Sequence, residues 1–214
     1  MDYMNKRKHF GTLLCAVSLV VFQFAITAKA QGEYGPNCIA VGPDGYVYVL
    51  NTKTNPETSL VEYSVTKFDT ADGEIIYDKK YDTQMSWPPG QPKIATDNSG
   101  NVYLGASVKG SNPKDEYDID FMTVKYDTAG KIAWEQRYQG PKKRYDNLTG
   151  VAVDISGNVY VTGDSLTKEN QKSGAYQYDM TTIKYDSQTG KKKWVKRYSS
   201  KAKSQQKSST PTAI

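Results

Sequence analysis

One unit recurs three times along this chain, and the recurrence constrains the fold more than any single motif does. The segments GPDGYVYVLN, DNSGNVYLGAS and DISGNVYVTGDS place Gly45, Gly100 and Gly157 at intervals of 55 and 57 residues. Each segment is followed by VTKFDTADG, TVKYDTAG or TIKYDSQTG, and each copy closes on EIIYDKKY, KIAWEQRY or KKKWVKRY. A fixed period of this length indicates one structural unit built three times.

Each copy predicts four antiparallel strands. The first strands are CIAVG, KIATD and GVAVD, and the second are YVYVL, NVYLG and NVYVTG. The two are joined by turns whose glycine can adopt a positive φ. The third strand ends in KFD or KYD, and a second glycine turn reverses the chain. The fourth strand carries Trp134 or Trp194, with Tyr77 at the same place in the first copy.

The distribution of apolar residues predicts how these sheets pack. The first two strands are apolar on both faces, as Val159, Tyr160 and Val161 show, whereas the fourth alternates, with Trp134 and Tyr138 on one face. We therefore expect an all-β fold of three four-stranded antiparallel blades of the β-propeller type, with the two inner strands of each blade covered on both sides. A single antiparallel meander or sandwich is the alternative.

The segments DNSGNVYLGAS, DISGNVYVTGDS and TIKYDSQTGKKKWVKRY resemble the bacterial β-propeller repeats of the SBBP type, which recur in secreted and cell-surface proteins. The resemblance covers roughly residues 36 to 198. The first copy departs from the pattern at Pro43-Asp44-Gly45 and at Tyr77, and we interpret it as a divergent or capping unit. The resemblance implies fold and export, and attaches no activity to particular residues.

The first thirty residues indicate a signal peptide. Lys6, Arg7 and Lys8 precede a largely apolar run of 14 residues, and Ala28-Lys29-Ala30 predicts cleavage before Gln31. As a helix this run rises only about 21 Å, short of the ~30 Å needed to span a bilayer. We expect a secreted, periplasmic or cell-surface protein with no membrane span after cleavage. The predicted order is a signal-peptide helix at 1–30, a repeat domain at 31–198 (repeats at about 36–90, 91–146 and 147–198) and a polar disordered tail at 199–214.

Cleavage of the signal peptide would exclude several kinds of site that depend on histidine or on paired cysteines. It removes His9 and Cys15, so the mature chain has no histidine and one thiol, Cys38. A disulfide within the chain, a zinc site that uses histidine and a Ser-His-Asp nucleophile are thereby excluded. The net charge of the body is close to neutral, which argues against a nucleic-acid groove. We assign no catalytic, cofactor-binding or metal-binding residue and expect no cofactor.

Three features of the sequence are candidate sites. The acidic stretch Asp115–Asp120 offers carboxylates for Ca²⁺ or for acid/base catalysis, but it lacks the residue order of a calcium loop and is interpreted as a solvated loop. Trp87, in the non-repeating linker SWPPGQP, either faces a ligand or caps a blade. Cys38 is either a small buried hydrophobe or the half of a disulfide between two chains.

These observations favour an exported, non-catalytic binding or scaffold module for a protein or a surface polysaccharide. The alternatives are a carboxylate-based extracellular hydrolase or lyase, and a fragment of a larger propeller without independent function. Single-chain propellers use four to eight blades, so three copies leave open edges. We therefore expect the chain to associate with itself through those edges, or to dock on an envelope protein or polysaccharide.

Overall fold

The computed structural model describes residues 36–87, 90–112, 114–170 and 175–199. The predicted signal peptide with its helix, and nearly all of the predicted tail, lie outside these residues. Every named element in the described ranges is a β-strand, and these ranges contain no helix with the length and apolar character needed to cross a membrane.

Twelve strands in the described ranges form three four-stranded antiparallel sheets, which we call blades one, two and three. Blade one consists of β1 (Pro36–Val41), β2 (Val47–Thr54), β3 (Val61–Phe68) and β4 (Ile75–Asp82). Blade two consists of β5 (Lys93–Thr96), β6 (Val102–Lys109), β7 (Ile119–Tyr126) and β8 (Ile132–Tyr138). Blade three consists of β9 (Asp146–Val153), β10 (Val159–Asn170), β11 (Ala175–Tyr185) and β12 (Lys192–Tyr198). The predicted all-β arrangement of three four-stranded antiparallel sheets is confirmed.

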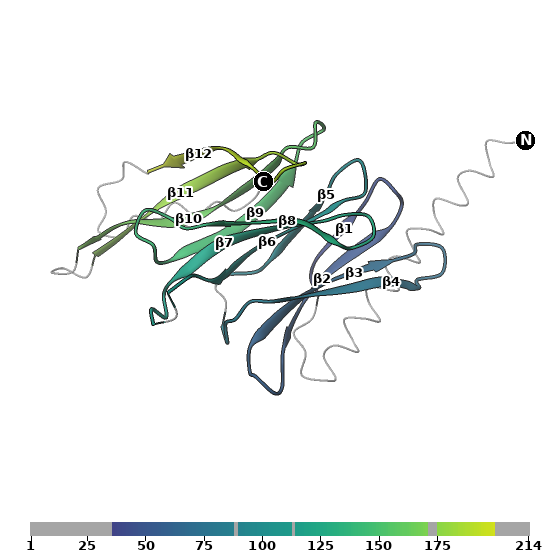
Figure 1. Cartoon of the computed structure of the whole chain (residues 1–214), viewed down its shortest axis with the longest axis horizontal. Helices are drawn as coiled ribbons and strands as arrows, with labels where there is room; N and C mark the ends of the chain where they lie inside the picture. Colours follow the sequence, from purple (N-terminus) through teal and green to yellow (C-terminus); the bar gives the residue numbers. More distant parts are fainter. Residues whose placement is uncertain (1–35, 88–89, 113, 171–174, 200–214) are drawn as a thin grey trace, which may run out of the picture.

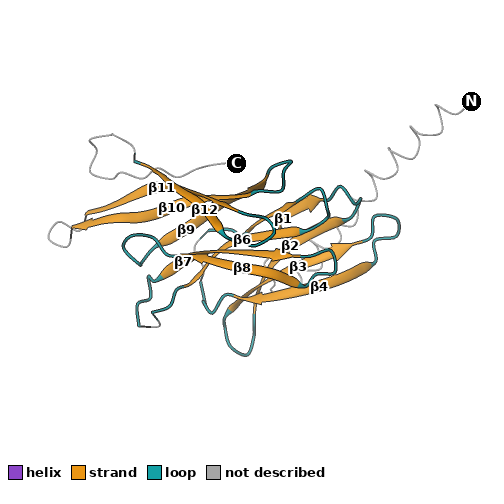
Figure 2. Ribbon diagram, turned by 45° about the horizontal axis from the view of Figure 1, so that its top comes forward, coloured by secondary structure: helices purple, strands orange, loops and turns teal. Residues whose placement is uncertain are grey.

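The blades are stacked, with blade two between blades one and three (Figures 1 and 2). Strand order within each blade follows the sequence, and the first strands of successive blades, β1, β5 and β9, contact one another. A propeller has this radial order, in which the first strands lie together and the fourth strands lie outside. Blades one and three each have one face turned away from blade two.

The first turn of each blade has the predicted geometry. Gly45, Gly100 and Gly157 have φ angles of 82°, 78° and 80°, a region that side chains with a Cβ rarely occupy. The amide of Gly100 donates to the carbonyl of Asp97 at 3.1 Å, and the amide of Gly157 donates to that of Asp154 at 2.8 Å. The spacing of these glycines in the sequence therefore marks three equivalent hairpin turns.

The turn aspartate of blades two and three holds a tyrosine of the second strand. The hydroxyl of Tyr103 donates to Asp97 at 2.8 Å, and the hydroxyl of Tyr160 donates to Asp154 at 2.9 Å. These bonds tie the start of the second strand to the turn that precedes it, so each hairpin is locked at both its glycine and its aspartate.

Blade one reaches the same arrangement with a different residue. Gly42 stands where the other blades have the turn aspartate, and Asp44, two residues later, accepts the hydroxyl of Tyr48 at 2.8 Å. Lys67 pairs with the same carboxylate at 3.2 Å. The departure of the first copy from the repeat pattern thus preserves the bond between the turn and the second strand.

The core lies between the blades. One cluster joins blades one and two, and its largest fully buried members are Tyr48, Leu50, Tyr63, Val65, Leu104, Met122 and Tyr126. A second cluster joins blades two and three and contains Tyr103, Phe121, Trp134, Tyr138, Leu148, Val159, Val161, Ile183 and Tyr185. A small third cluster in blade one consists of Val47, Val49 and Phe68.

In blades one and two, an aromatic residue of the outer strand packs on a glycine turn of the next blade. Tyr77 of β4 lies against Gly130, where an added Cβ would come within 3.1 Å of its ring. Trp134 of β8 lies against Gly190 in the same way, and its indole nitrogen donates to the carbonyl of Ser187 at 2.9 Å. The repeated aromatic position is thus an anchor between blades, and the repeated glycine leaves room for it.

The predicted burial of the first two strands is only half correct. The second strands β2, β6 and β10 are buried along most of their length, but β1 and β5 are half-buried or exposed, and β9 is only partly buried. The third strand β7 is almost fully buried instead. The reason is the open array: first strands line a side on which the described chain has no opposing blades, whereas the middle strands of blade two are covered by neighbouring blades on both faces.

Candidate functional site

The segments that differ most among the three copies gather at one end of the blades, which we call the loop end. They are the loops between second and third strands and the links between blades. The first blade link is held there because the amide of Val61, at the start of β3, donates to the carbonyl of Met85 at 2.7 Å. Binding residues are often found on loops that a rigid scaffold positions in this way.

The link between blades two and three is clamped at the loop end. The amide of Ile119, at the start of β7, donates to the carbonyl of Arg144 at 3.2 Å. The amide of Leu166 in β10 donates to the carbonyl of Tyr145 at 3.0 Å. The backbone of Arg144 and Tyr145 is therefore hydrogen-bonded to strands of two different blades, which positions both side chains.

Arg144 lies between two carboxylates and an aromatic ring. Its guanidinium pairs with Asp115 at 3.1 Å and with Glu169 at 3.0 Å, and it lies 5.6 Å from the ring centroid of Tyr117. Asp115 and Tyr117 come from the β6–β7 loop, whereas Glu169 comes from β10. The arginine therefore joins segments from blades two and three, and the planar guanidinium suits such a multiple contact.

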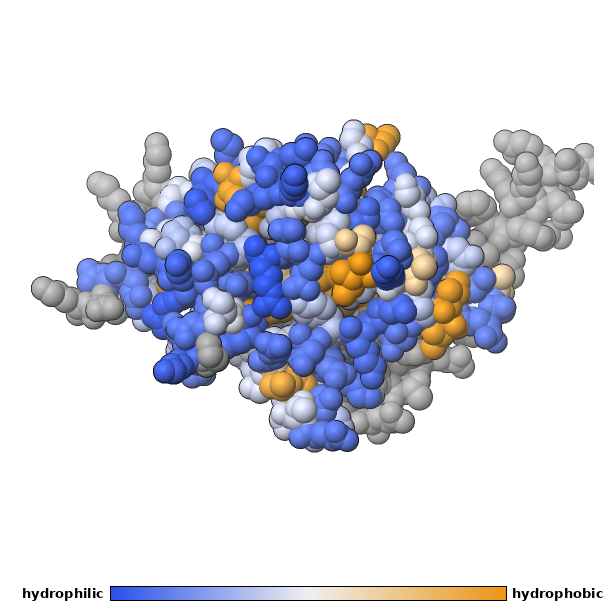
Figure 3. Space-filling model, viewed as in Figure 1, coloured by the Kyte–Doolittle hydropathy of each residue, from blue (hydrophilic) through white to orange (hydrophobic). Residues whose placement is uncertain are grey.

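Four tyrosines surround this ionic centre. The rings of Tyr145 and Tyr178 lie edge to face at 5.8 Å, and Tyr117 and Tyr176 are exposed. We call this group the loop-end cluster; it consists of Asp115, Tyr117, Arg144, Tyr145, Glu169, Tyr176 and Tyr178. Tyrosine and arginine are enriched at binding interfaces because they offer a large, fairly rigid contact surface with polar groups. The face of the molecule in Figure 3 is mainly hydrophilic, with small scattered apolar patches.

This cluster was not predicted from the sequence, in which Trp87 was the only aromatic residue considered as a ligand contact. Tyr117 and Tyr176 stand at equivalent places in the second and third copies, whereas Tyr178 aligns with Ile119 and Tyr145 lies in a blade link. The concentration of tyrosines in these loops and in the link was the available signal. It gave no indication that three segments far apart in the chain would meet.

The interpretation of Asp115–Asp120 as a solvated loop is wrong for two of its carboxylates. Asp118 and Asp120 are buried, because the chain enters β7 at Ile119 and both aspartates flank that entry. Asp118 accepts the amide of Asn112 at 2.5 Å and the side-chain amide of Gln139 at 3.3 Å. Asp118 therefore secures the β6–β7 loop, while only the first part of the stretch reaches solvent.

Asp120 and Asp146 have raised pKa values. Burial, with a further contribution from Asp118, raises the pKa of Asp120 to about 6. Burial raises the pKa of Asp146 to about 7, although hydrogen bonds from Ser165 and Gly140 oppose the shift. Both oxygens of Asp146 are engaged by these two donors, each at 2.5 Å. This carboxyl group is buried and fastens the link between blades two and three.

We expect the stability of the protein to fall as the pH rises from about 4 to 7. The folded state binds the proton of Asp146 more tightly than the unfolded chain, whose aspartates titrate near pH 3.9. The favourable contribution is thus fully present below pH 4 and is lost as the pH approaches 7, with a change on the order of 3 kcal/mol. Urea unfolding at several pH values measures it.

The matched variants for this experiment are Asp146→Asn and Asp154→Asn. Asp146→Asn removes the carboxyl group with the larger shift and should reduce the pH dependence, leaving the smaller part that comes from Asp120. Asp154→Asn should leave it intact, because hydrogen bonds from Asn158 lower the pKa of Asp154 rather than raise it. An unfolding free energy that is constant between pH 4 and 7 in the unsubstituted chain would contradict the assignment.

The two remaining candidates have clear environments. Trp87 is 76% exposed, so the interpretation of this ring as a blade cap is wrong; its linker is hydrogen-bonded at the loop end.

Cys38 is half-buried against the first core cluster, 3.7 Å from the carbonyl of Pro92, and burial raises its pKa to about 11. Its environment agrees with the small buried hydrophobe, since a thiol with this pKa is protonated and unreactive.

In the described ranges, no group of three or more histidine, cysteine, aspartate or glutamate side chains is placed to hold a metal ion. The carboxylates of the loop-end cluster are instead paired with Arg144.

One comparison with known proteins found a match. Residues 137–167 match the family model of the beta-propeller repeat called SBBP. The matched segment runs from the end of β8 through β9 into β10 and includes Arg144, Tyr145 and Asp146. No curated protein matches the chain.

Proposed function

We propose that this chain, which carries a beta-propeller repeat of the SBBP type, is an exported non-catalytic binding module that holds another protein or a surface polysaccharide at its loop-end cluster. The observation that supports the proposal most directly is the fixed position of Arg144 beside the exposed ring of Tyr117. Tyrosine rings stack on sugars and peptides alike, and the neighbouring carboxylates add hydrogen-bond acceptors at the rim.

The rigidity of the cluster also supports binding. One backbone hydrogen bond and two ion pairs hold Arg144 before any partner arrives, and a second backbone hydrogen bond holds the adjacent Tyr145. A partner therefore loses little free energy to ordering the site, which is the advantage of a preorganised surface. Trp87 lies on the linker at the same end and offers a further exposed ring.

An enzyme based on carboxylates is the less favoured function. The raised pKa of Asp146 would suit a general acid, but the group is buried and both of its oxygens accept hydrogen bonds from the chain. A general acid must reach the atom that it protonates. Its contacts therefore favour a structural role for Asp146 over a catalytic one.

The proposal is tested by retention of a partner on the immobilised protein. Envelope extracts and surface polysaccharide from the host are passed over the unsubstituted chain, and the retained component is purified and titrated. Tyr117→Ala with Tyr176→Ala should weaken its binding at least tenfold, as expected for hot-spot rings. Export is checked in the same preparation, since cleavage before Gln31 leaves a mature chain that begins at this residue.

The control for this experiment is Ile155→Ala. Ile155 is an exposed apolar residue in the β9–β10 turn, at the opposite end of the blades. Binding that survives the loss of both tyrosines, or that is lost equally in the control, would contradict the proposed site. Turnover of the polysaccharide that stops on Asp120→Asn would favour the enzyme instead.

A further inference from the structure

In the contact between blades two and three, side chains of blade two bind a turn of blade three. The indole nitrogen of Trp134 and the ammonium of Lys125 both donate to the carbonyl of Ser187, at 2.9 and 3.0 Å. The Trp134 ring lies on Gly190, in the same turn. Two donors and one ring thus hold a single turn of the following blade.

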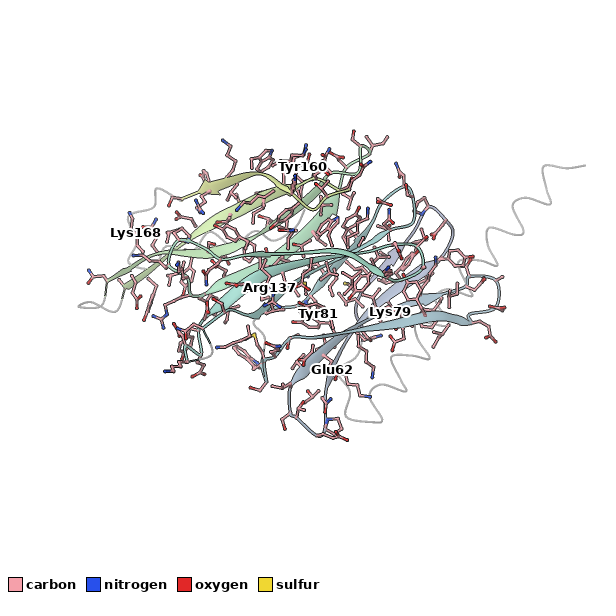
Figure 4. All side chains as sticks on the ribbon, viewed as in Figure 1. Glu62, Lys79, Tyr81, Arg137, Tyr160 and Lys168 are labelled. Carbon is pink, nitrogen blue, oxygen red and sulfur yellow. The ribbon has the colours of Figure 1, made fainter. Side chains whose placement is uncertain are left out.

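A second contact recurs further along the outer strands. Arg137 donates to the hydroxyl of Tyr81 at 3.0 Å, and Arg197 donates to the hydroxyl of Tyr138 at 2.5 Å. Figure 4 shows Tyr81 and Arg137 side by side between β4 and β8. In both cases the tyrosine at the end of an outer strand accepts a hydrogen bond from an arginine of the next blade. That arginine comes directly before the tyrosine that ends its own outer strand.

Blade three carries equivalent residues on its outer face, and no further blade covers them in the part of the chain that the structure describes. Trp194 stands at the position of Trp134 and is 37% exposed, against 8% for Trp134. Tyr198 stands at the position of Tyr138 and is 62% exposed, against 4% for Tyr138. The anchors that are buried between blades two and three are therefore open on blade three.

The geometry of this open face matches that of the occupied one. The rings of Trp194 and Tyr160 lie 6.0 Å apart, as those of Trp134 and Tyr103 do at 5.9 Å. Lys184 lies 5.1 Å from the Tyr160 ring, as Lys125 does from Tyr103 at 5.5 Å. We call Tyr160, Lys184, Trp194 and Tyr198 the Trp194 face. This face therefore has the same arrangement of side chains as the face of blade two that holds a turn of blade three.

Blade one offers a turn of the required shape at the other end of the array. Asp69-Thr70-Ala71-Asp72-Gly73 has the same length as Asp186–Gly190, the turn that Trp134 contacts. The amide of Gly73 donates to the carbonyl of Asp69 at 3.0 Å, and that of Gly190 donates to Asp186 at 2.9 Å. Ala71 and Asp72 are exposed at its tip. The Asp69–Gly73 turn thus has the same length and hydrogen bond as the Asp186–Gly190 turn, and its tip is exposed for contact.

The charges of the two surfaces are complementary. The turn of blade one and the residue that follows it contain three acidic residues, Asp69, Asp72 and Glu74. The Trp194 face contains Lys184, and the exposed Lys196 follows Trp194 by two residues on the same side of β12. Opposite charges of this kind favour association and fix its orientation.

We propose that the Trp194 face binds the Asp69–Gly73 turn of a second copy of this chain. Trp194 and Lys184 donate to the carbonyl of Thr70, at the place of Ser187, and the Tyr198 hydroxyl accepts from Lys80, at the place of Arg197. The contact is made by the turn and β4, since Val47, Val49 and Phe68 on that side of blade one are already buried. Two copies joined at both ends contain six blades, within the range of closed propellers.

The first test is the mass of the full chain, purified from a host that exports it, by light scattering over a range of concentrations. The unsubstituted chain should form a dimer, and Trp194→Ala should raise its dissociation constant at least tenfold. Trp87→Ala, which removes an exposed tryptophan outside the Trp194 face, should leave the dimer unchanged. Circular dichroism spectra of all three confirm that the chains are folded. An unsubstituted chain that stays monomeric at every concentration overturns the proposal.

The second test uses the head-to-tail direction of the contact. Asp72→Lys with Glu74→Lys reverses charge on the turn and leaves the Trp194 face intact, whereas Trp194→Ala leaves the turn intact. Each variant alone should be mainly monomeric, and an equimolar mixture should regain association through one intact pair of surfaces. A mixture that associates no better than its separate components overturns head-to-tail docking, even if the unsubstituted chain dimerises.

Discussion

Trp134→Ala is expected to lower the free energy of unfolding by about 4 kcal/mol, a typical cost for removing a buried tryptophan. The indole fills the space between blades two and three, where it packs at 5.9 Å from Tyr103 and 6.2 Å from Tyr185. It also donates to Ser187, and its ring covers Gly190. Alanine would leave a cavity in the core cluster that joins the two blades.

Urea unfolding, followed by far-UV circular dichroism, measures this loss as a lower midpoint. Trp87→Ala is the matched control, because Trp87 is 76% exposed and its truncation should change the unfolding free energy by no more than about 0.5 kcal/mol. Equal effects of the two substitutions would show that Trp134 does not anchor the blades.

Gly163→Ala is expected to destabilise the protein by about 3 kcal/mol, at the upper end of the usual cost of overpacking. An added Cβ would lie 2.1 Å from the backbone oxygen of Asn147 and 2.8 Å from the Cα of Leu148. These are backbone atoms of the paired strand β9, so they cannot move aside as a flexible side chain can. The pairing of β9 with β10, which already shifts register between Thr162 and Gly163, would have to open.

The control for this prediction is Gly105→Ala. A Cβ on Gly105 would meet side-chain atoms of Leu148 and Val151 at 3.2 to 3.4 Å, and small rotations of the leucine can relieve the contact. We expect a loss below about 1 kcal/mol in the same urea experiment. A loss at Gly163 no larger than that at Gly105 would contradict the argument from the backbone clash.

The repeat pattern alone does not predict that the backbone of β9 lies against Gly163. Blade two has Ala106 at the equivalent position. Its first strand, β5, has 4 residues and pairs with β6 only as far as Gly105, whereas β9 has 8 residues and continues alongside β10. The longer strand brings its backbone against Gly163. Equivalent sequence positions thus differ because the strands beside them differ in length.

The loop-end cluster escaped prediction for a related reason. Its residues come from loops and a blade link that differ in length and sequence among the copies, so the repeat pattern does not show which of them meet. Arg144 meets Asp115 and Glu169 because blades two and three stack with their loops at one end. The burial of Asp118 and Asp120 follows from the same stacking, which covers the entry to β7.

The sequence by itself determined the strands, their order and the two turns of every blade, because turn glycines, alternating apolar residues and short-range hydrogen bonds act within about 60 residues. It also placed the aromatic position that anchors one blade to the next. Only the tertiary structure decided which faces of the strands are covered and which loops meet. It also showed that blade three leaves its anchor residues open. These outcomes depend on contacts between residues far apart in the chain, and a local pattern carries no information about what packs against it.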